Sequence, residues 1–304
     1  MSRRRLAVCL LALGWSAPGA WADSLNDYLG PRAIAIGESL RADARGGLAT
    51  TLNPAGLALG RELVFEGSYG YRAVDGASAV SVSACDSTVP VPGCFYYHYF
   101  TAAPDVSGTM EDRRAHEGGF TVSRAIASRV SLGLTTKYFD YESSMPGEED
   151  ASGLTFDLGS TIVLSPSFNA AVVGYNLWGE DSAQYPRAVA GGLVARPAGA
   201  LTLGMDALWN LDADRAGSSG RFGGGGEYFV RSASMQTGYP IRLGGIYDQG
   251  RDAGYVTGGL GLISLKLGVD VGARVQVSGG DEVMVHASLR LFGPRGGAGA
   301  PPAQ

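Results

Sequence analysis

Apolar and polar residues alternate along most of this chain in segments of about ten residues. Successive side chains of a strand point to opposite faces, so the pattern predicts strands with one apolar face and one polar face. A tilted strand needs about this length to cross a bilayer. The alternation is clearest in the segments 151–164, 201–211, 264–275 and 283–292.

Counted along the whole chain, the alternation predicts fourteen strands. They are expected at 61–72, 77–84, 94–102, 114–124, 129–139, 152–164, 168–177, 187–195, 200–210, 221–230, 233–240, 254–262, 264–275 and 283–292. An even number of antiparallel strands is typical of bacterial outer-membrane barrels. The other class with this pattern and with 47 glycines is a large soluble β protein.

The connections between these strands favour the barrel. Transmembrane barrels alternate short periplasmic turns with longer extracellular loops, whereas a soluble sandwich has no reason to do so. The short connections are 125–128, 165–167, 196–199, 231–232 and 263, and the longer ones are 103–113, 140–151, 178–186, 212–220 and 241–253. Two connections break the rule, because 73–76 is a tight turn and 85–93 is long. We therefore predict an all-β fold, a transmembrane antiparallel barrel.

Residues 1–22 have the features of a cleavable signal peptide. Three arginines precede a short apolar run, and Ala20-Trp21-Ala22 forms an A-x-A cleavage site. Cleavage would leave 21 basic and 29 acidic residues, a formal charge of −8, which argues against a nucleic-acid partner. We expect residues 61–292 to form the barrel and residues 293–304 to be a disordered Gly/Pro/Ala tail.

The stretch 30–60 lies between the signal peptide and the first strand, and it is rich in Gly and Ala. It contains Gly30, Arg32, Gly37, Asp43 and the run Asn53-Pro54-Ala55-Gly56-Leu57. In these residues it resembles the N-terminal segment of the FadL fatty-acid channels and their PorV-type relatives. The plain alternative is a surface turn, because Asn-Pro commonly starts turns.

The resemblance implies that residues 23–60 fold into the barrel as a plug, or hatch. The hatch residues carried over are Gly37, Asp43, Asn53, Pro54, Ala55 and Gly56. The family also implies passage or binding of small hydrophobic ligands. This chain departs from the fatty-acid channels in its short loops, which leave fatty-acid uptake itself in question.

Ten charged or titratable side chains fall on the polar faces of the predicted strands. They are Glu66, Lys137, Asp157, Asp206, Glu227, Lys266, Asp270, Arg274, His286 and Arg290. A lipid-facing Arg or Lys near the bilayer midplane costs roughly 2–4 kcal/mol, so this face should point into the lumen. Because acids and bases are mixed, we expect ion pairs between wall and hatch. The alternative is that some of these residues lie at the rims in water.

Cys85 and Cys94 are the two cysteines that remain after export, and the cell envelope is oxidising. They flank a short stretch with Pro90, Pro92 and Gly93, which favours a turn. We predict a disulfide between them, the alternative being two free thiols.

The sequence offers little chemistry. The three histidines have no metal-ligand spacing, and the glycine runs open no helix with Lys-Ser/Thr, so we expect no metal and no cofactor. His286 and Ser288 lie two apart on one face, which leaves a barrel lipid hydrolase as a weak alternative. We otherwise expect no enzyme activity.

The preferred function is passive passage or binding of small hydrophobic molecules across the outer membrane of a Gram-negative cell. A second hypothesis is a non-conducting, PorV-like anchor for a secreted or periplasmic protein. The expected partners are outer-membrane lipid and either a hydrophobic ligand or that protein.

Overall fold

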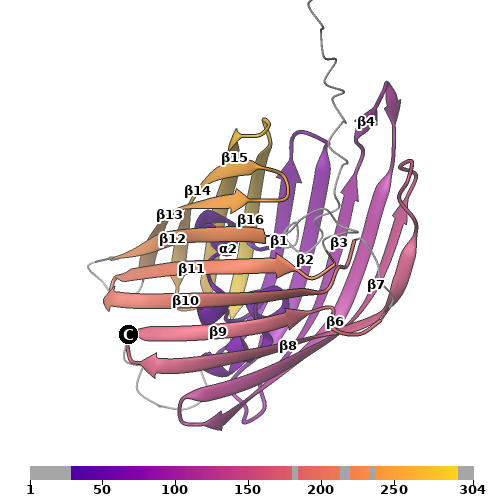
Figure 1. The fold of residues 1–304 in the computed structure, drawn as a ribbon. Helices are drawn as coiled ribbons and strands as arrows, with labels where there is room; N and C mark the ends of the chain where they lie inside the picture. The colour runs from indigo at the N-terminus through magenta and orange to yellow at the C-terminus, as the bar shows by residue number, and fades with distance from the viewer. Residues whose placement is uncertain (1–28, 180–183, 213–219, 233–236, 294–304) are drawn as a thin grey trace, which may run out of the picture.

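In a computed structural model, which describes residues 29–179, 184–212, 220–232 and 237–293, fourteen antiparallel strands close into a barrel (Figure 1). The barrel strands are β1 (Leu63–Arg72), β2 (Ala77–Asp86), β3 (Gly93–Ala102), β6 (Arg113–Ala127), β7 (Val130–Ser143), β8 (Ala151–Ser165), β9 (Phe168–Tyr175), β10 (Ala188–Ala198), β11 (Leu201–Asn210), β12 (Gly220–Arg231), β13 (Thr237–Asp248), β14 (Ala253–Ser264), β15 (Leu267–Ser278) and β16 (Val283–Phe292). The prediction of a fourteen-stranded barrel is confirmed. The predicted signal peptide and residues 294–304 lie outside the described residues.

The barrel closes where β1 pairs with β16, from Val64 opposite Phe292 to Arg72 opposite Met284. Every other neighbouring pair is consecutive along the chain, apart from β3 and β6. Between those two strands, β4 (Asp105–Val106) and β5 (Thr109–Met110) form a separate small hairpin. Closure pairs the backbone of every barrel strand on both sides, as a strand in hydrocarbon requires.

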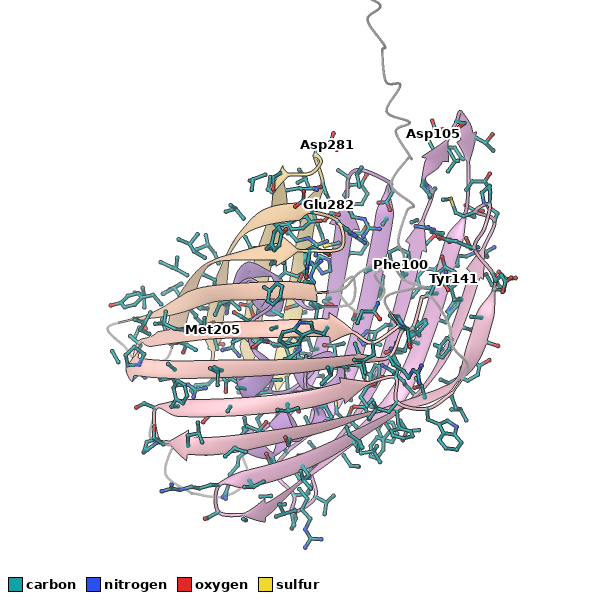
Figure 2. The ribbon with its side chains drawn as sticks, viewed as in Figure 1. Phe100, Asp105, Tyr141, Met205, Asp281 and Glu282 are labelled. Atoms are coloured by element: carbon teal, nitrogen blue, oxygen red, sulfur yellow. A yellow bond between two sulfur atoms is a disulfide. The ribbon has the colours of Figure 1, made fainter. Side chains whose placement is uncertain are left out.

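The outer face of the barrel is apolar, and the inner face is polar. In β16, Val283, Val285 and Leu289 are exposed, whereas His286 and Ser288 are buried. Figure 2 shows the same contrast at Met205, which points away from the barrel and is 63% exposed. An apolar belt around a polar lumen is the arrangement that a bilayer requires.

The two ends of the barrel differ in their connections. We call the end with the described residues 73–76, 103–112, 144–150, 176–179, 184–187, 211–212, 249–252 and 279–282 the loop rim. The opposite end, with 87–92, 128–129, 166–167, 199–200, 232 and 265–266, is the turn rim. Both exceptions noted in the sequence remain, since 73–76 is short and 87–92 is comparatively long. Short turns face the periplasm in barrels of this kind.

The largest error in the predicted strands concerns β13. It spans Thr237–Asp248 rather than 233–240, so the expected long connection 241–253 shrinks to 249–252. Pro240, Gly244 and Gly245 indicated a loop. Proline has no N–H, and the ladder to β14 skips Tyr239 and Pro240 before it resumes at Ile241. The glycines are ordinary members of the strand.

Aromatic side chains lie on the outer face near each rim. Tyr71, Trp178, Trp209 and Tyr247 are exposed toward the loop rim, and Phe65, Phe95, Tyr228 and Tyr239 toward the turn rim. Such girdles mark the two interfaces of a membrane. The belt between them is the segment that crosses the bilayer.

The predicted disulfide is present. Cys85 of β2 lies directly opposite Cys94 of β3, and their sulfurs are bonded. The bridge ties two neighbouring strands together close to the turn rim.

Residues 29–60, which we call the N-terminal segment, form four short helices inside the ring of strands (Figure 1). They are α2 (Pro31–Ala35), η1 (Arg41–Asp43), α3 (Leu48–Thr51) and η2 (Pro54–Leu59). In the described part of the chain, no helix is long and apolar enough to cross a membrane.

Candidate functional site

The N-terminal segment occupies the lumen and packs against most of the wall. Helix α2 lies against β13 to β16, η1 against β9 and β10, and η2 against β6 to β8. Its apolar side chains, including Ile34, Ile36, Leu40 and Leu52, are fully buried and form one core cluster. The segment therefore brings its own apolar core into a lumen whose wall is polar.

Glycines on the inner face of the wall let this segment approach backbone to backbone. A Cβ atom placed on Gly204 would overlap the carbonyl oxygen of Ser39, and one on Gly223 would overlap that of Gly37. The same holds for Gly133 against Pro54 and for Gly272 against Pro31. Because no side chain separates the two backbones here, neither a ligand nor a water layer fits between them.

Gly37 itself belongs to this contact. Its φ of 70° lies in the left-handed region, which glycine adopts without strain. A Cβ at this position would lie 2.5 Å from the carbonyl oxygen of Gly224 and 2.6 Å from that of Gly245. A glycine is thus required both for the turn after α2 and for the close approach to β12 and β13.

The turn at Asn53 joins two parts of the segment to the wall. The Asn53 side chain is fully buried; its Nδ2 donates to the carbonyl oxygen of Arg41 at 2.8 Å and to Thr161 Oγ1 at 2.9 Å. Its Oδ1 accepts from the backbone N–H of Ala55 at 3.0 Å and so caps η2, which starts at Pro54. Both the amide nitrogen and the carbonyl oxygen of this side chain are therefore hydrogen-bonded.

The residues that follow continue the contact. Ser123 and Ser131, on the inner faces of β6 and β7, both donate to the carbonyl oxygen of Ala55, at 3.1 and 3.2 Å. Gly56 packs so closely that a Cβ would overlap the carbonyl oxygen of Ala44. This turn fixes the N-terminal segment against β6 to β8.

Ion pairs fix the segment on the opposite side of the lumen. Glu38 is 4% exposed and binds two wall arginines, Arg221 at 2.8 Å and Arg274 at 3.0 Å. Arg221 also pairs with Asp248, and Arg274 with Glu282. A carboxylate from the segment thus joins β12, β13 and β15 through two buried guanidinium groups.

Two arginines of the segment make the reciprocal contact. Arg41 pairs with Asp206 of β11 at 3.1 Å and donates to Tyr175 Oη at 2.8 Å. Arg32 pairs with Glu227 of β12 at 3.2 Å. Burial alone lowers the pKa of Arg32, but Glu227 and Asp43 raise it above the ordinary value. The guanidinium therefore stays charged and paired.

Asp43 lies among three arginines at the turn-rim side of the segment. It pairs with Arg45 at 2.9 Å, with Arg196 of β10 at 2.6 Å and with Arg32 at 3.7 Å. Burial by itself raises the pKa of the Asp43 carboxyl, but Arg45, Arg32 and Arg196 lower it below its usual range. The carboxylate is ionised and shared between segment and wall.

The structure places nine of the ten predicted lumen residues on the inner face. These are Glu66, Lys137, Asp157, Asp206, Glu227, Asp270, Arg274, His286 and Arg290. Lys266 is the exception, and its predicted lumen position is wrong. Strand β14 ends at Ser264, so Lys266 lies exposed in the turn before β15. Lys266 continues the alternation of polar residues in β15, but this strand starts one residue later, at Leu267.

Several charged residues of this network were missed from the sequence. Arg242 is fully buried and bridges Glu227 and Asp270, both at 2.6 Å, and Asp270 also pairs with Arg290. Arg242 lies beyond the predicted end of its strand, and Arg221 at the start of another. Arg242 and Asp248 are an even number of residues apart, so they share one face of a strand. A predicted strand that continued past Pro240 would have placed both side chains in the lumen.

One part of the lumen is apolar. Phe100, Phe139 and Tyr141 point inward from β3 and β7, and Tyr185 from the loop 176–187 covers them. The rings of Phe139 and Tyr185 stack with centroids 4.0 Å apart. We call these four residues the aromatic cluster; Figure 2 shows Phe100 and Tyr141 within it. Next to it lies the buried Lys137–Asp157 ion pair, at 2.9 Å.

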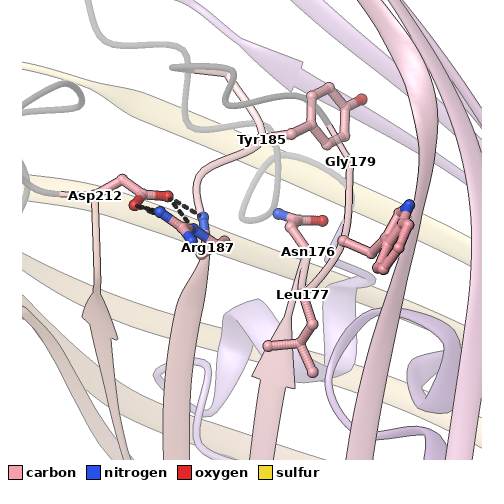
Figure 3. Close-up of a pocket in the computed structure, with 7 residues that line it drawn as sticks. Asn176, Leu177, Gly179, Tyr185, Arg187 and Asp212 are labelled. Atoms are coloured by element: carbon pink, nitrogen blue, oxygen red, sulfur yellow. Dashed lines mark hydrogen bonds and ion pairs between the residues drawn. The ribbon is translucent and has the colours of Figure 1, made fainter.

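A cavity of about 500 Å³ opens at the loop rim beside this cluster (Figure 3). It is lined by Asn176, Leu177 and Trp178 after β9 and by Arg187 and Asp212, which pair at 2.7 Å. Tyr185 belongs to this cavity and to the aromatic cluster. Its ring therefore separates the rim cavity from the apolar part of the lumen.

The wall formed by β1, β2 and β3 differs from the rest. Its outer face carries a groove of about 600 Å³, almost entirely apolar, which includes Phe65, Ala84, Phe95 and Leu289. A cavity of about 20 Å³ lies inside the same wall, against Gly47 of the N-terminal segment. Glu66, Val82 and Ser83 line both spaces. We call this part the thin wall.

The described histidines and their acidic neighbours do not form a metal site or a catalytic pair. Among the described residues, no group of three or more His, Cys, Asp or Glu is arranged to hold a metal ion. His286 and Ser288 both face the lumen, but among the described residues no hydrogen bond joins them. The charged groups around His286 are Arg274, Arg72 and Glu38, and the Glu38 carboxylate pairs with Arg221 and Arg274 instead of orienting the imidazole.

No protein-family model matches the chain, and no curated protein matches it in sequence. Among solved structures it is similar to the toluene transporter TbuX of Ralstonia pickettii, with a TM-score of 0.68 and 12% identity, covering 88% of this chain and 98% of that one. It is also similar to the toluene transporter TodX of Pseudomonas putida (TM-score 0.64, 12% identity, 88% and 98% covered) and to a FadL homologue of Pseudomonas aeruginosa (0.61, 12%, 86% and 97%). The FadL-like barrel fold is confirmed, and the likeness to PorV stays a prediction.

Proposed function

We propose that the protein is an outer-membrane barrel that binds small hydrophobic molecules and lets them pass. The aromatic cluster carries the proposal. A lumen lined by ion pairs has no structural need for Phe100, Phe139, Tyr141 and Tyr185 on one inward face, which also includes four buried alanines. Apolar side chains with a few polar groups nearby are typical of a site for a small ligand.

The size and chemistry of the site favour a compact aromatic or alicyclic ligand. The rim cavity of about 500 Å³ leads to Tyr185, whose stacked partner Phe139 offers a second aromatic face. Offset stacking on such rings favours a flat apolar molecule. Toluene is a suitable probe, because the structural neighbours include toluene transporters.

In this proposal the N-terminal segment is a hatch that closes the barrel to water and ions. Backbone contact at the inner glycines and buried ion pairs at Glu38, Arg41 and Asp43 leave no aqueous path along those strands. The thin wall is the proposed exit, since an apolar groove facing lipid and a cavity facing the hatch share its residues.

A non-conducting anchor for a protein partner is the second candidate. The tightly held N-terminal segment favours it equally, since an anchor needs a sealed lumen and no ligand. The two functions differ in the aromatic cluster, which an anchor does not use.

The test is binding of toluene to the full-length protein in detergent, followed by saturation-transfer NMR. Phe139→Asn places an amide in the aromatic cluster, and Tyr138→Asn makes the matched change on the outer face of the same strand. We expect Phe139→Asn to weaken binding at least about tenfold and Tyr138→Asn to leave it unchanged. No binding by the unmodified protein, together with a stoichiometric co-purifying protein, would favour the anchor.

A further inference from the structure

The exposed charges of the barrel are divided between the two rims. All seven exposed acidic residues in the described ranges lie at or next to the loop rim: Asp105, Asp112, Glu142, Glu149, Asp150, Asp252 and Asp281. Figure 2 shows Asp105 and Asp281 at that end. Five of the seven exposed basic residues in these ranges lie at the turn rim instead: Arg61, Arg124, Arg129, Arg231 and Lys266. We call these five the basic ring.

Within the described ranges, the basic ring lacks acidic partners. Of the described residues, none forms an ion pair with a member of the ring, although the same structure pairs most of its buried arginines. The acids nearest in sequence, Glu62 and Asp86, are only partly exposed. The ring therefore presents uncompensated positive charge to whatever surrounds this end of the barrel.

The ring follows the circumference rather than one side. Arg61 precedes β1, Arg124 and Arg129 flank the turn between β6 and β7, Arg231 ends β12, and Lys266 lies between β14 and β15. In the closed order these strands are spread around the barrel. A single globular partner would meet only part of such a ring, whereas membrane lipids surround all of it.

The ring also lies at the depth of a membrane interface. Arg124 is on the outer face of β6, next to Leu132 of β7, and the exposed Phe95, Tyr228 and Tyr239 mark the same end of the belt. Aromatic belts lie at headgroup level, and arginine and lysine extend from there toward phosphate. Basic residues in this position attract anionic lipid surfaces.

We infer that the basic ring binds the phosphate headgroups of anionic phospholipids in the leaflet at the turn rim. The acidic loop rim is repelled by the same headgroups, so the charge division also opposes the inverted orientation. This inference is independent of the proposed ligand, because it concerns the outer surface and requires only a folded barrel.

The experiment is native mass spectrometry of the full-length protein in detergent, titrated with dioleoyl phosphatidylglycerol or with dioleoyl phosphatidylcholine. The test variant is R61Q/R124Q/R129Q/R231Q/K266Q. The control variant, A73E/V74E/T109E/R114Q/Q249E, lowers the net charge by the same five units at the loop rim. Both are first checked for a folded barrel by heat-dependent mobility on a denaturing gel.

We expect the unmodified protein and the control to retain phosphatidylglycerol in preference to phosphatidylcholine. The test variant should retain it at least about tenfold more weakly, with phosphatidylcholine unchanged. Equal retention by the test variant would overturn the inference, as would no preference in the unmodified protein. If the test variant does not fold, a salt titration of the unmodified protein decides instead. Retention of phosphatidylglycerol must then fall with rising salt, and retention that is insensitive to salt contradicts the inference.

Discussion

Two parts of the barrel wall hold the N-terminal segment in different ways. Strands β11 to β15, which we call the docking wall, meet it with glycines such as Gly204, Gly223 and Gly272, and with buried arginines that pair with Glu38. The thin wall of β1 to β3 meets it through apolar contacts of Ala49 and Leu57 with the disulfide, and a small cavity remains beside them. The docking wall therefore provides polar attachment, and the thin wall leaves some space.

This difference separates two requirements that a plugged barrel must meet together. A plug that excludes ions has to be fixed firmly, whereas a ligand needs a place where contact is loose. In the proposed function, the docking wall meets the first requirement and the thin wall meets the second.

The largest effect is expected from Gly223→Val in the docking wall. Its side chain would have to occupy the place of the Gly37 carbonyl oxygen, so the backbone contact between wall and segment cannot form. We expect the segment to be displaced and ion-conducting steps to appear in planar bilayers. Gly224→Val, on the opposite face of the same strand, is the matched control. Conductance that stays at zero in both variants would show that the glycine contact does not seal the lumen.

The second largest effect is expected from Glu38→Ala, which should lower the free energy of unfolding. It removes the carboxylate that the buried Arg221 and Arg274 share, and loss of one member of a buried pair costs roughly 3–5 kcal/mol. The remaining acids Asp248 and Glu282 should reduce this to the lower end. Chemical unfolding measured by tryptophan fluorescence checks it, with the exposed Glu149→Ala as control. A stability equal to that of the control would mean that these pairs do not hold the segment.

Removal of the disulfide should affect the thin wall and the part of the N-terminal segment packed against it. Cys85 and Cys94 tie β2 to β3 and lie in one buried apolar cluster with Ala49 and Leu57 of the segment. C85S/C94S should lower the free energy of unfolding by roughly 2 kcal/mol, as expected for a short loop. Hydrogen exchange should rise in β1 to β3 and stay constant in β12 to β15. A uniform rise would contradict the separation of the two walls.

The smallest effect concerns pH and Asp43. Because three arginines hold its pKa below the usual value, Asp43 stabilises the fold at every pH above the ordinary carboxyl range. That contribution is lost as the pH falls through the lowered pKa. The stability difference between the unmodified protein and Asp43→Asn should thus stay constant from pH 8 to pH 5 and shrink below about pH 4. A difference that shrinks between pH 7 and pH 5 would refute this assignment.

The sequence predicts the barrel well because its outer face must be apolar at every second position. In segments such as 283–292, the alternation predicts the strand, its lipid-facing side and both of its ends. The pattern fails at β13, where Pro240 and the pair Gly244-Gly245 resemble loop residues, although a strand tolerates them once its neighbours are paired.

The site was less predictable, because its contacts join residues far apart in the sequence. That Asp206 and Glu227 face the lumen follows from alternation, but their pairing with Arg41 and Arg32 depends on how the N-terminal segment lies inside. Gly223 gives no sequence signal that separates a docking contact from barrel curvature. The aromatic cluster likewise needs Tyr185 to fold back over Phe139, which no local pattern indicates.

The most direct test of the account is uptake of radiolabelled toluene by Gram-negative cells that express the barrel. Ala84→Trp fills the apolar groove of the thin wall, and Ala273→Trp makes the same change on the outer face of the docking wall. With equal amounts of folded barrel, we predict uptake at background for Ala84→Trp and at the unmodified level for Ala273→Trp. Equal uptake by both variants, or background uptake by the unmodified protein, would contradict passage of a ligand through the thin wall.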